Sequence, residues 1–558
     1  MKKNIRIPIC CLLAFVFCLV NVYAQTGALN AGKRPHDWWL ADWKNDSIPE
    51  ICLDKAYNYL KGRKSKPVIV AIIDNCVDTA HEELKDFIWT NKKEIPGNGI
   101  DDDRNGYVDD VHGWCFIANK NNIAQTKQSA LETLVYVAWK NKLENIDTSK
   151  LDKETRPQYD IYQTAKEMVF ERYHFFRLIA LVQSDSVKFA QYFDNLLLKY
   201  RDIKLKDIPF STILSTDAYD SVANLFFGYF IKFVPTTSTV SIFKNRLKTI
   251  PGFFSGFINF VNNYIQKDKY DTTINYRAII GDDPDNFNDK GYGTPSINLP
   301  DIGGEHATMI AGIIGANRNN AVGIKGIADN VLIMPLVTAV PGGGSISKDM
   351  VMAIHYAVDN GASIINMSLG TTPWIDEHEK ELRDAFDYAD KHNVLIVNAA
   401  GNDGLSLEQE KYLLGQGSDG KEHDDYIRVG ATTTLMNDSL VSSFSNFGEK
   451  SVDLFAPGTA IYSTAPGNNY TIQSGTSLAC PVVTGVAALL KAYFPKLTAR
   501  QLKEILMKSV YKTDLMVVPP THAGFTNKIP FSKMSKSGGI VNAFNAVRLA
   551  DEMMKKEK

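Results

Sequence analysis

The sequence predicts an α/β fold in three layers, with helices on both faces of a mostly parallel sheet, interrupted by an all-α insertion. Two observations carry this prediction. Short runs of valine, isoleucine and leucine alternate with helix-like stretches at about 67–80 and about 328–550, which is typical of strands that helices cover on both sides. Between about 119 and 276 this rhythm stops, and apolar residues recur at helical spacing instead.

The buried strands are expected at the apolar runs 68–73, 331–334, 363–367 and 394–397. Continuous apolar runs, in contrast to alternating ones, suit strands that are buried on both faces. One intervening helix is expected near 347–358, where apolar residues recur on a single face. Because ligands bind at the carboxyl ends of the strands in such sheets, functional residues are expected just after the strands.

The central stretch is expected to form a helical subdomain. Leu131, Leu134, Val135 and Ala138 fall on one helix face, and aromatic residues are frequent, as at 253–260. Amphipathic helices of soluble proteins normally pack, so this pattern favours a core of its own. An exposed apolar surface for a substrate or a partner is the alternative.

The composition excludes several classes of protein. The chain has 558 residues, of which 44% are hydrophobic, and this excludes a disordered or collagen-like protein. Lysine and arginine (61) nearly balance aspartate and glutamate (63), for a net charge of −2. Neither nucleic acid nor an anionic membrane surface is therefore an expected partner.

The first 24 residues have the layout of a cleaved secretory signal. Lys2, Lys3 and Arg6 precede an apolar run at 7–20, and small residues lead to a cut after Ala24. The run is short for a membrane span, which needs about 20 residues. We therefore expect a secreted or periplasmic protein with no stable membrane span after signal cleavage.

These patterns divide the chain into four segments: a signal peptide at 1–24, an N-terminal segment with the first part of the α/β domain at 25–118, the helical insertion at 119–276, and the remainder of the α/β domain at 277–551. Cleavage of the signal leaves four cysteines, whose pairing the sequence does not choose: Cys52, Cys76, Cys115 and Cys480.

Four polar residues stand where a parallel-sheet enzyme places its functional groups. Asp74 ends the first apolar run, and His306 opens a helix of small residues. Asn402 follows a strand and a turn, and Ser477 begins a long apolar helix that ends near Ala492. Singly, none is specific, because a serine at a helix start is usually a cap and an aspartate after a strand usually begins a turn.

Together the four residues meet the needs of acyl transfer. A serine hydroxyl becomes a good nucleophile when a histidine takes its proton, and a buried carboxylate holds that histidine in the correct tautomer. We therefore predict that Ser477 attacks, His306 relays the proton and Asp74 orients His306. The Asn402 amide and the backbone N–H of Ser477 would stabilise the oxyanion, and no cofactor is required for this chemistry.

These segments resemble the subtilisin-like serine peptidases, or subtilases (peptidase family S8), whose triad follows the order Asp, His, Ser. The likeness covers roughly 68–77 and 306–550, and its most specific piece is the Gly-Thr-Ser-x-Ala-x-Pro element at 475–481. The resemblance implies a subtilisin-like catalytic domain that hydrolyses peptide bonds of protein or peptide substrates. It also implies that two segments bind the substrate, namely Ser368, Leu369 and Gly370, and Ala400 and Gly401.

The chain departs from the family pattern beside two of these residues. Cys76 and Ala307 stand where the family usually has glycine. Glycine adopts backbone conformations that other residues avoid, so these changes predict altered loop geometry and lower activity.

Two other interpretations stay open. Glu305, beside His306, points to a serine-carboxyl peptidase, which uses an acidic base, although His306 and Asn402 fit a neutral-pH subtilase better. The other alternative is a binding or scaffold protein that keeps the fold with weak catalysis and uses the helical insertion for recognition.

An acidic loop at 101–110 predicts a structural calcium site. Its spacing matches an EF-hand-type loop that wraps oxygen ligands around the turn at Gly106. Position twelve is His112 in place of the usual glutamate, for which Asp110 is a substitute, and a solvated acidic turn is the alternative. The resemblance favours calcium, since many subtilases bind it. The predicted ligands are Asp101, Asp103, Asn105, Tyr107 and Asp109.

Overall fold

The computed structural model describes residues 38–40, 51–152, 155–184, 267–341, 344–369, 378–409, 413–520 and 527–556. The predicted signal peptide and the aromatic stretch at 253–260 lie outside these residues. Two compact units are distinguished and are described separately. Lys127–Tyr276 forms the smaller one, and Met1–Thr126 with Arg277–Lys558 forms the larger one.

Within the described residues, the larger unit contains a nine-stranded sheet in the order β10-β13-β7-β6-β5-β4-β1-β3-β2. Every neighbouring pair is parallel except β10 and β13. The mostly parallel sheet predicted from the apolar runs is therefore confirmed. The strands are β1 (Val68–Asp74), β2 (Trp114–Cys115), β3 (Val331–Val337), β4 (Ile364–Met367), β5 (Leu395–Ala399), β6 (Tyr426–Thr432), β7 (Leu454–Pro457), β10 (Tyr511–Lys512) and β13 (Gly539–Ile540).

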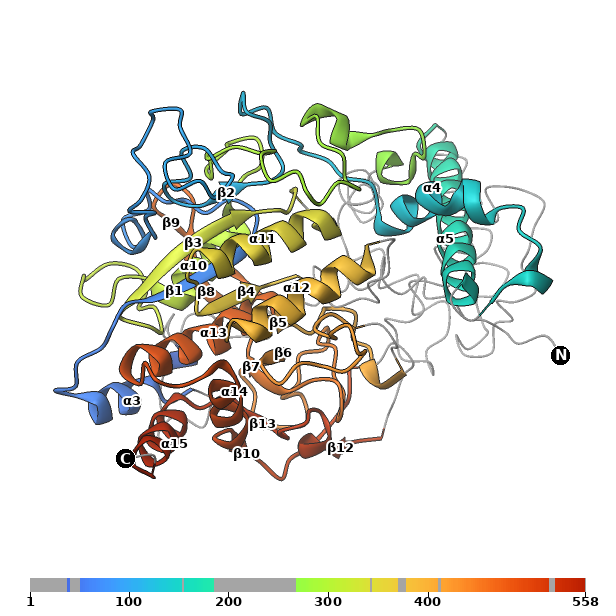
Figure 1. Cartoon of the computed structure of the whole chain (residues 1–558). Coiled ribbons are helices and arrows are strands. Elements are labelled where there is room, and N and C mark those ends of the chain that lie inside the picture. The colour runs from blue at the N-terminus through green and yellow to red at the C-terminus, as the bar shows by residue number, and fades with distance from the viewer. Residues whose placement is uncertain are drawn as a thin grey trace. The chain divides into compact units, whose positions relative to one another are not determined.

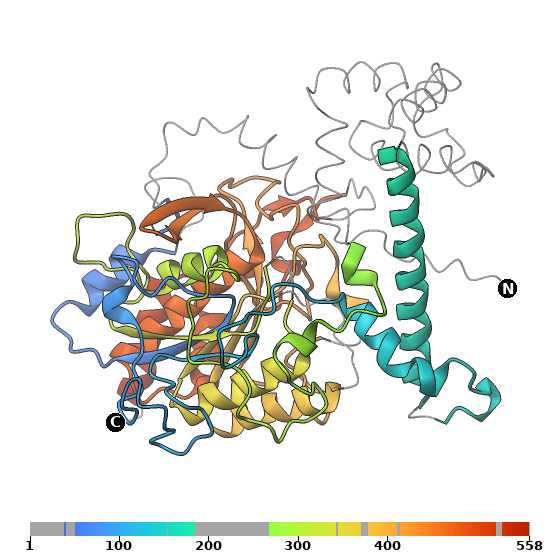
Figure 2. The ribbon, with the colours of Figure 1, turned by 90° about the horizontal axis from the view of Figure 1, so that it is seen from above.

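Helices cover both faces of this sheet, as can be followed in Figure 1 and, from above, in Figure 2. α10 (Glu305–Gly315) and α13 (Thr476–Tyr493) pack on one face, and α11 (Ser347–Asp359) and α12 (Glu379–Lys391) pack on the other. The predicted three-layer fold is confirmed. Among the described residues, the remaining α-helices of this unit are α3 (Leu53–Leu60), α14 (Ala499–Lys508) and α15 (Ala543–Lys556). The remaining strands form two hairpins, β8 (Ile461–Ala465) with β9 (Asn469–Gln473) and β11 (Met516–Val517) with β12 (Ile529–Pro530).

Strand β1 contributes to both layers of the core. Val70 and Ile72 join the cluster beside α10 and α13, whereas Ala71 and Ile73 join the cluster beside α11 and α12. Successive side chains of a strand point to opposite faces, so a strand between two helix layers must be apolar at every position. Asp74 ends this run at the carboxyl edge of the sheet.

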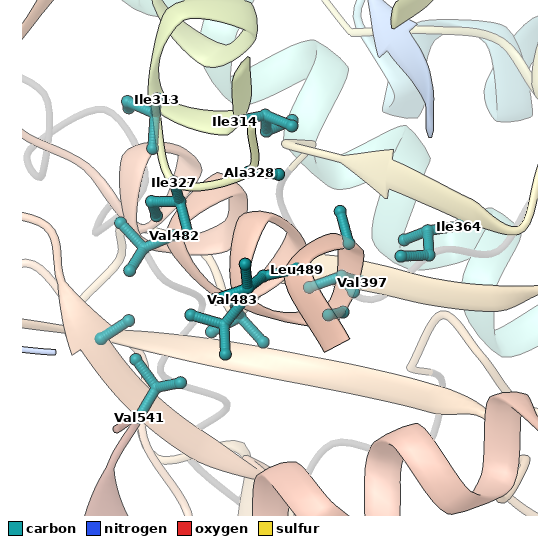
Figure 3. Close-up of a cluster of buried hydrophobic side chains, with 14 of the residues drawn as sticks. Ile313, Ile314, Ile327, Ala328, Ile364, Val397, Val482, Val483, Leu489 and Val541 are labelled. Atoms are coloured by element: carbon teal, nitrogen blue, oxygen red, sulfur yellow. The ribbon is translucent and has the colours of Figure 1, made fainter. Parts of the chain in front are cut away.

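Helix α13 lies at the centre of one core layer. Figure 3 shows Val482, Val483 and Leu489 of this helix in one cluster with Ile313 and Ile314 of α10, and all five side chains are fully buried. Of the described helices, α13 is the one long and apolar enough to cross a membrane by length and composition, but 83% of it is buried inside the protein. Its apolar composition is thus that of a core helix.

The described part of the smaller unit is helical. α4 (Leu131–Leu143) packs against α5 (Thr155–Ser184), where the ring of Tyr136 stacks on that of Tyr162 at 5.9 Å between centroids. The predicted face was partly wrong, because Ala138 is exposed whereas Trp139 is buried. The large aromatic side chains gain more from burial than the alanine does, and they rotate the buried face of α4.

We expect replacement of Ile314 by alanine to lower the free energy of unfolding by about 2–5 kcal/mol, because it removes three buried carbon atoms and leaves a cavity. The matched control is Ile472→Ala on β9, whose isoleucine is 54% exposed; it should cost less than about 1 kcal/mol. Chemical denaturation followed by circular dichroism measures both. Equal losses would contradict the placement of α10 in the core.

Candidate active site

A carboxylate and an imidazole meet at the carboxyl edge of the sheet. Asp74 is the last residue of β1 and is 2% exposed, and His306 is the second residue of α10. His306 Nδ1 lies 2.9 Å from Oδ1 and 3.0 Å from Oδ2 of Asp74. A carboxylate in this position holds the proton on Nδ1, so that Nε2 is left as the basic nitrogen.

The start of α10 is fixed against the end of β1 by Asn75. Its Oδ1 accepts a hydrogen bond from the backbone N–H of Ala307 at 3.0 Å, and its own N–H donates to Asp74 Oδ1 at 2.7 Å. Gly304 allows the close approach, because a Cβ at this position would lie 2.6 Å from the carbonyl oxygen of Cys76. Asn75 therefore helps to position both the Asp74 carboxylate and the start of the helix that carries His306.

Cys76 and Ala307, which stand where the family usually has glycine, have backbone conformations that do not require glycine. Neither Cys76 nor Ala307 has a positive φ, so both adopt backbone conformations that are open to any residue. The Cys76 thiol is buried and accepts a hydrogen bond from the Leu299 N–H at 3.4 Å. Among the described residues the cysteines form no disulfide, and all four are buried: Cys52, Cys76, Cys115 and Cys480.

The amide of Asn402 is oriented by the residue that precedes the serine. Asn402 Oδ1 accepts hydrogen bonds from the backbone N–H and the hydroxyl of Thr476, both at 2.9 Å. A Cβ placed on Gly475 would lie 2.8 Å from Ser477 Oγ and 3.7 Å from Asn402 Nδ2. With its oxygen held by two donors, the amide directs its NH₂ group toward the helix start that carries Ser477, where an oxyanion needs donors.

The loop that carries Asn402 is held by Asn446. The Nδ2 group of Asn446 donates to the Ala400 carbonyl at 2.9 Å, and its backbone N–H donates to the Gly401 carbonyl at 2.9 Å. Gly401 has a φ of +100°, and a Cβ there would lie 2.4 Å from Asn446 Nδ2. Only glycine suits this position, and its N–H donates to Thr476 Oγ1 at 3.2 Å.

The segments predicted to bind substrate follow two neighbouring strands. Ser368 and Leu369 come after β4, Ala400 and Gly401 come after β5, and β4 pairs with β5. Ser368 Oγ donates to the carbonyl oxygen of Ser477 at 2.7 Å. This bond ties the end of β4 to the helix start that carries the serine. Gly370, also predicted here, lies outside the described residues.

Sequence reasoning missed three residues that build this site. Asn75 and Thr476 are neighbours of predicted catalytic residues, and that adjacency was the available signal. Nothing in the sequence marks Asn446, because its side chain bonds a carbonyl 46 positions away. All three act through side-chain hydrogen bonds to the backbone or to the site residues themselves.

A comparison with known proteins decides the family. The model of the subtilase family, Peptidase_S8, matches residues 65–528.

The chain belongs to the subtilase family.

Several curated relatives are named as proteases. The chain is 39% identical to a thermophilic serine proteinase of Bacillus sp. (strain AK1) over 37% of the chain and 45% of that protein. It is 36% identical to subtilisin DY of Bacillus licheniformis over 37% of the chain and 69% of that protein. It is 35% identical to the major intracellular serine protease of Bacillus subtilis (strain 168) over 43% of the chain and 71% of that protein. The family and these names support a serine-type endopeptidase.

A hollow of about 670 Å³ opens beside the start of α10 in this subtilase. Gly304 and Glu305, which directly precede His306, line it together with Asn469 and Tyr470 of β9. Its volume lies within the usual range of ligand sites, about 300–1,000 Å³. His306 itself is not among the residues that line the hollow.

The acidic loop brings two of the predicted calcium ligands close to a glutamate that precedes the loop. Asp101 and Asp103 lie beside Glu94, with carboxylate oxygens of the three within 4.8 Å of one another. The Asp109 carboxylate instead accepts hydrogen bonds from the backbone of Asn98 and Gly99. Asn105 Nδ2 donates to Asp110 Oδ2 at 2.9 Å, and the Tyr107 ring packs on that of Trp114 at 5.0 Å between centroids. Neither contact involves the Asn105 amide oxygen or the Tyr107 carbonyl, which are the atoms that an EF-hand-type loop uses.

Opposing effects act on the pKa of His306. Burial lowers this pKa, whereas the charge and hydrogen bond of Asp74 and the charge of Glu305 raise it, and the net result is a pKa above the usual value. The neutral imidazole is the form that can accept a proton. Activity should therefore be lost as the pH falls through this raised pKa.

We expect the activity of the Glu305→Gln subtilase to fall off at a lower pH than that of the parent, because the substitution removes a negative charge that raises the pKa of His306. This acid-side fall in activity is called the acid limb. The measurement is the pH dependence of kcat/KM with a peptide substrate. Asp301→Asn, which removes an exposed charge nearby in the sequence, should leave the limb in place. An acid limb of Glu305→Gln that is unchanged or lies at higher pH would contradict this prediction.

Proposed function

We propose that this chain is a secreted serine endopeptidase that hydrolyses peptide bonds through an acyl-enzyme. The observation that carries the proposal is the contact of His306 Nδ1 with the buried Asp74, at 2.9 Å. The contact leaves Nε2 of His306 free to act as a base. His306 lies at the start of α10, and α10 packs against α13. Ser477 stands at the start of α13, with the Asn402 amide next to it.

The proposed reaction begins when Ser477 Oγ attacks the carbonyl carbon of the substrate and His306 Nε2 takes the hydroxyl proton. The negative charge that develops on the carbonyl oxygen is stabilised by the Asn402 amide and by the backbone N–H of Ser477 at the N-terminus of α13. The charge of Asp74 stabilises the imidazolium of His306.

The intermediate then collapses. The C–N bond breaks as His306 gives its proton to the leaving amine, and an ester between Ser477 and the acyl part of the substrate remains. Water, deprotonated by His306, attacks the ester carbon. The C–O bond to Ser477 then breaks, His306 returns the proton to Ser477 Oγ, and the acid is released.

The substrate is proposed to be an extended protein or peptide segment. Ser368 and Leu369, after β4, and Ala400 and Gly401, after β5, border the same sheet edge as Asp74.

Export is proposed from residues 1–24, which have the layout of a secretory signal. Two relatives from Bacillus subtilis are named cell wall-associated protease and minor extracellular protease Epr. A third is named major intracellular serine protease, so the export proposal depends chiefly on the signal-like segment.

Two substitutions should separate the roles in catalysis. Ser477→Ala should lower kcat by roughly 10⁶-fold, the order found in subtilisin for loss of its serine. Asn402→Ala should lower kcat by about 10²–10³-fold with little change in KM, as in subtilisin, because the oxyanion exists only after attack. Steady-state kinetics with a peptide substrate measures both parameters.

The control is Ser532→Ala, which removes an exposed hydroxyl and should retain the parental kcat. A Ser477→Ala protein as fast as the parent would overturn the proposed triad. A raised KM with unchanged kcat in Asn402→Ala would assign the amide to substrate binding. A parent that binds peptides but does not cleave them would favour a scaffold protein over an enzyme.

A further inference from the structure

A buried asparagine lies beside one of the segments that are proposed to bind substrate. Asn398 is on β5, where it pairs with Met367, the last residue of β4, and it is fully buried. It is not one of the proposed catalytic groups. A buried amide is costly unless its donors and acceptors are satisfied, so its hydrogen bonds indicate what it does in this position.

The Asn398 amide bonds the chain on both sides of Ser368. Its Nδ2 group donates to the carbonyl oxygen of Met367 at 2.8 Å and to that of Leu369 at 3.0 Å. The pairing of β4 with β5 ends at Met367, so this pairing does not hold Leu369. Both donors of the amide thus hold the backbone of a short stretch, called here the 367–369 segment, which includes the two described residues proposed to bind substrate after β4.

Tyr426 determines which way the amide points. Its hydroxyl donates to Asn398 Oδ1 at 2.7 Å, and the NH₂ group faces the two carbonyl oxygens, which can only accept. Tyr426 begins β6 and is 1% exposed. Its ring packs edge to face on Phe386 of α12 at 5.7 Å between centroids, and a Cβ on Gly415 would lie 2.5 Å from it. Close packing of this ring therefore keeps the hydroxyl on the amide.

A second polar network holds the same segment from the other core layer. The Ser368 hydroxyl donates to the Ser477 carbonyl oxygen at 2.7 Å and accepts from Asn366 Nδ2 at 3.0 Å. Asn366 Oδ1 accepts from the hydroxyl of Thr484 on α13 at 2.8 Å. Tyr426, in contrast, belongs to the cluster beside α11 and α12. The 367–369 segment is thus held from both layers of the core.

The packing of the strands alone does not require an amide at this position. Ile396, two residues earlier on β5 and therefore on the same face of the strand, is apolar and buried. An apolar side chain at position 398 would continue this core without the cost of burying an amide. It would leave the carbonyl oxygen of Leu369 without its amide donor. The polar side chain is therefore needed where the chain leaves the sheet.

We propose that Asn398 is a positioning residue for substrate binding, which holds the 367–369 segment in the conformation that pairs with an extended peptide. The inference rests on the proposed endopeptidase function and adds a residue that shapes its binding site. A peptide that pairs with a protein segment as an added strand needs the backbone groups of that segment already in place. The amide supplies this preorganisation, which otherwise has to be met from the binding free energy.

Asn398→Ala should raise KM for unfolded, fluorescein-labelled casein at least about tenfold and leave kcat within about twofold, because the lost interaction acts equally on bound substrate and transition state. Hydrolysis of p-nitrophenyl acetate should keep its parental rate, since the acetyl group is too short to lie along the segment. Tyr426→Phe keeps the amide and removes its orienting donor, so it should raise KM by a smaller factor. Steady-state kinetics measures all three.

The matched control is Asn542→Ala, which removes another buried amide. Asn542 is 3% exposed, and its Oδ1 accepts from the backbone N–H of Asn545 at 2.9 Å at the start of α15. The substitution should lower the melting temperature without changing KM for casein. Every variant is assayed at a temperature at which circular dichroism shows it to be folded.

Binding in a Ser477→Ala background separates this proposal from the proposed reaction. Fluorescence anisotropy of the same labelled casein measures affinity without cleavage, and adding Asn398→Ala should weaken this affinity at least about tenfold. A parent that cleaves neither casein nor the ester would contradict the proposed reaction, and the anisotropy would still decide the role of Asn398. A Ser477→Ala protein that does not bind casein would overturn the positioning role.

Three further results would overturn it. One is an Asn398→Ala protein whose KM and affinity for casein match those of its parent. Another is an equal loss of casein and ester hydrolysis, which would place the effect on the triad or on the whole fold. The third is a KM that rises as much in Asn542→Ala as in Asn398→Ala, which would indicate a general effect of losing a buried amide.

Discussion

The hydrogen bond between the buried Asp74 carboxylate and His306 Nδ1 is the interaction on which the proposed chemistry depends. Its two residues are 232 positions apart in the sequence. They meet because β1 ends at the carboxyl edge of the parallel sheet, next to the start of α10. The rest of the larger unit can be understood as the structure needed to hold this pair and to bring Ser477 to it on α13.

Side-chain amides and one hydroxyl, more than charges, give the site its shape. Asn75 connects Asp74 to the start of α10, Thr476 orients the Asn402 amide, and Asn446 holds the loop on which Asn402 lies. Each of these residues forms hydrogen bonds that hold a backbone group or another side chain of the site in place. Beneath them, the burial of α13 against α10 and the sheet fixes the start of the helix that carries the serine.

The sequence predicted the parallel sheet because strands buried on both faces must be apolar throughout, and it placed Asp74 and His306 because the chemistry needs those residue types. It could not predict contacts whose partners are distant in the chain. Asn446 bonds a carbonyl 46 positions away, and Glu94, which precedes the acidic loop in the sequence, lies beside Asp101 and Asp103. On α4 the spacing favoured Ala138, but packing buried Trp139, since side-chain size and not spacing alone selects the buried face.

The central claim is that the Asp74–His306 pair activates Ser477. Its most direct test is the rate at which a fluorophosphonate probe labels the chain, with the labelled residue mapped by mass spectrometry. The account predicts a single label on Ser477 and a rate that falls by roughly 10⁴-fold in Asp74→Asn, the effect that the same change has on catalysis in a serine protease of another fold. A label on another residue, or an Asp74→Asn protein labelled at the parental rate, would contradict it.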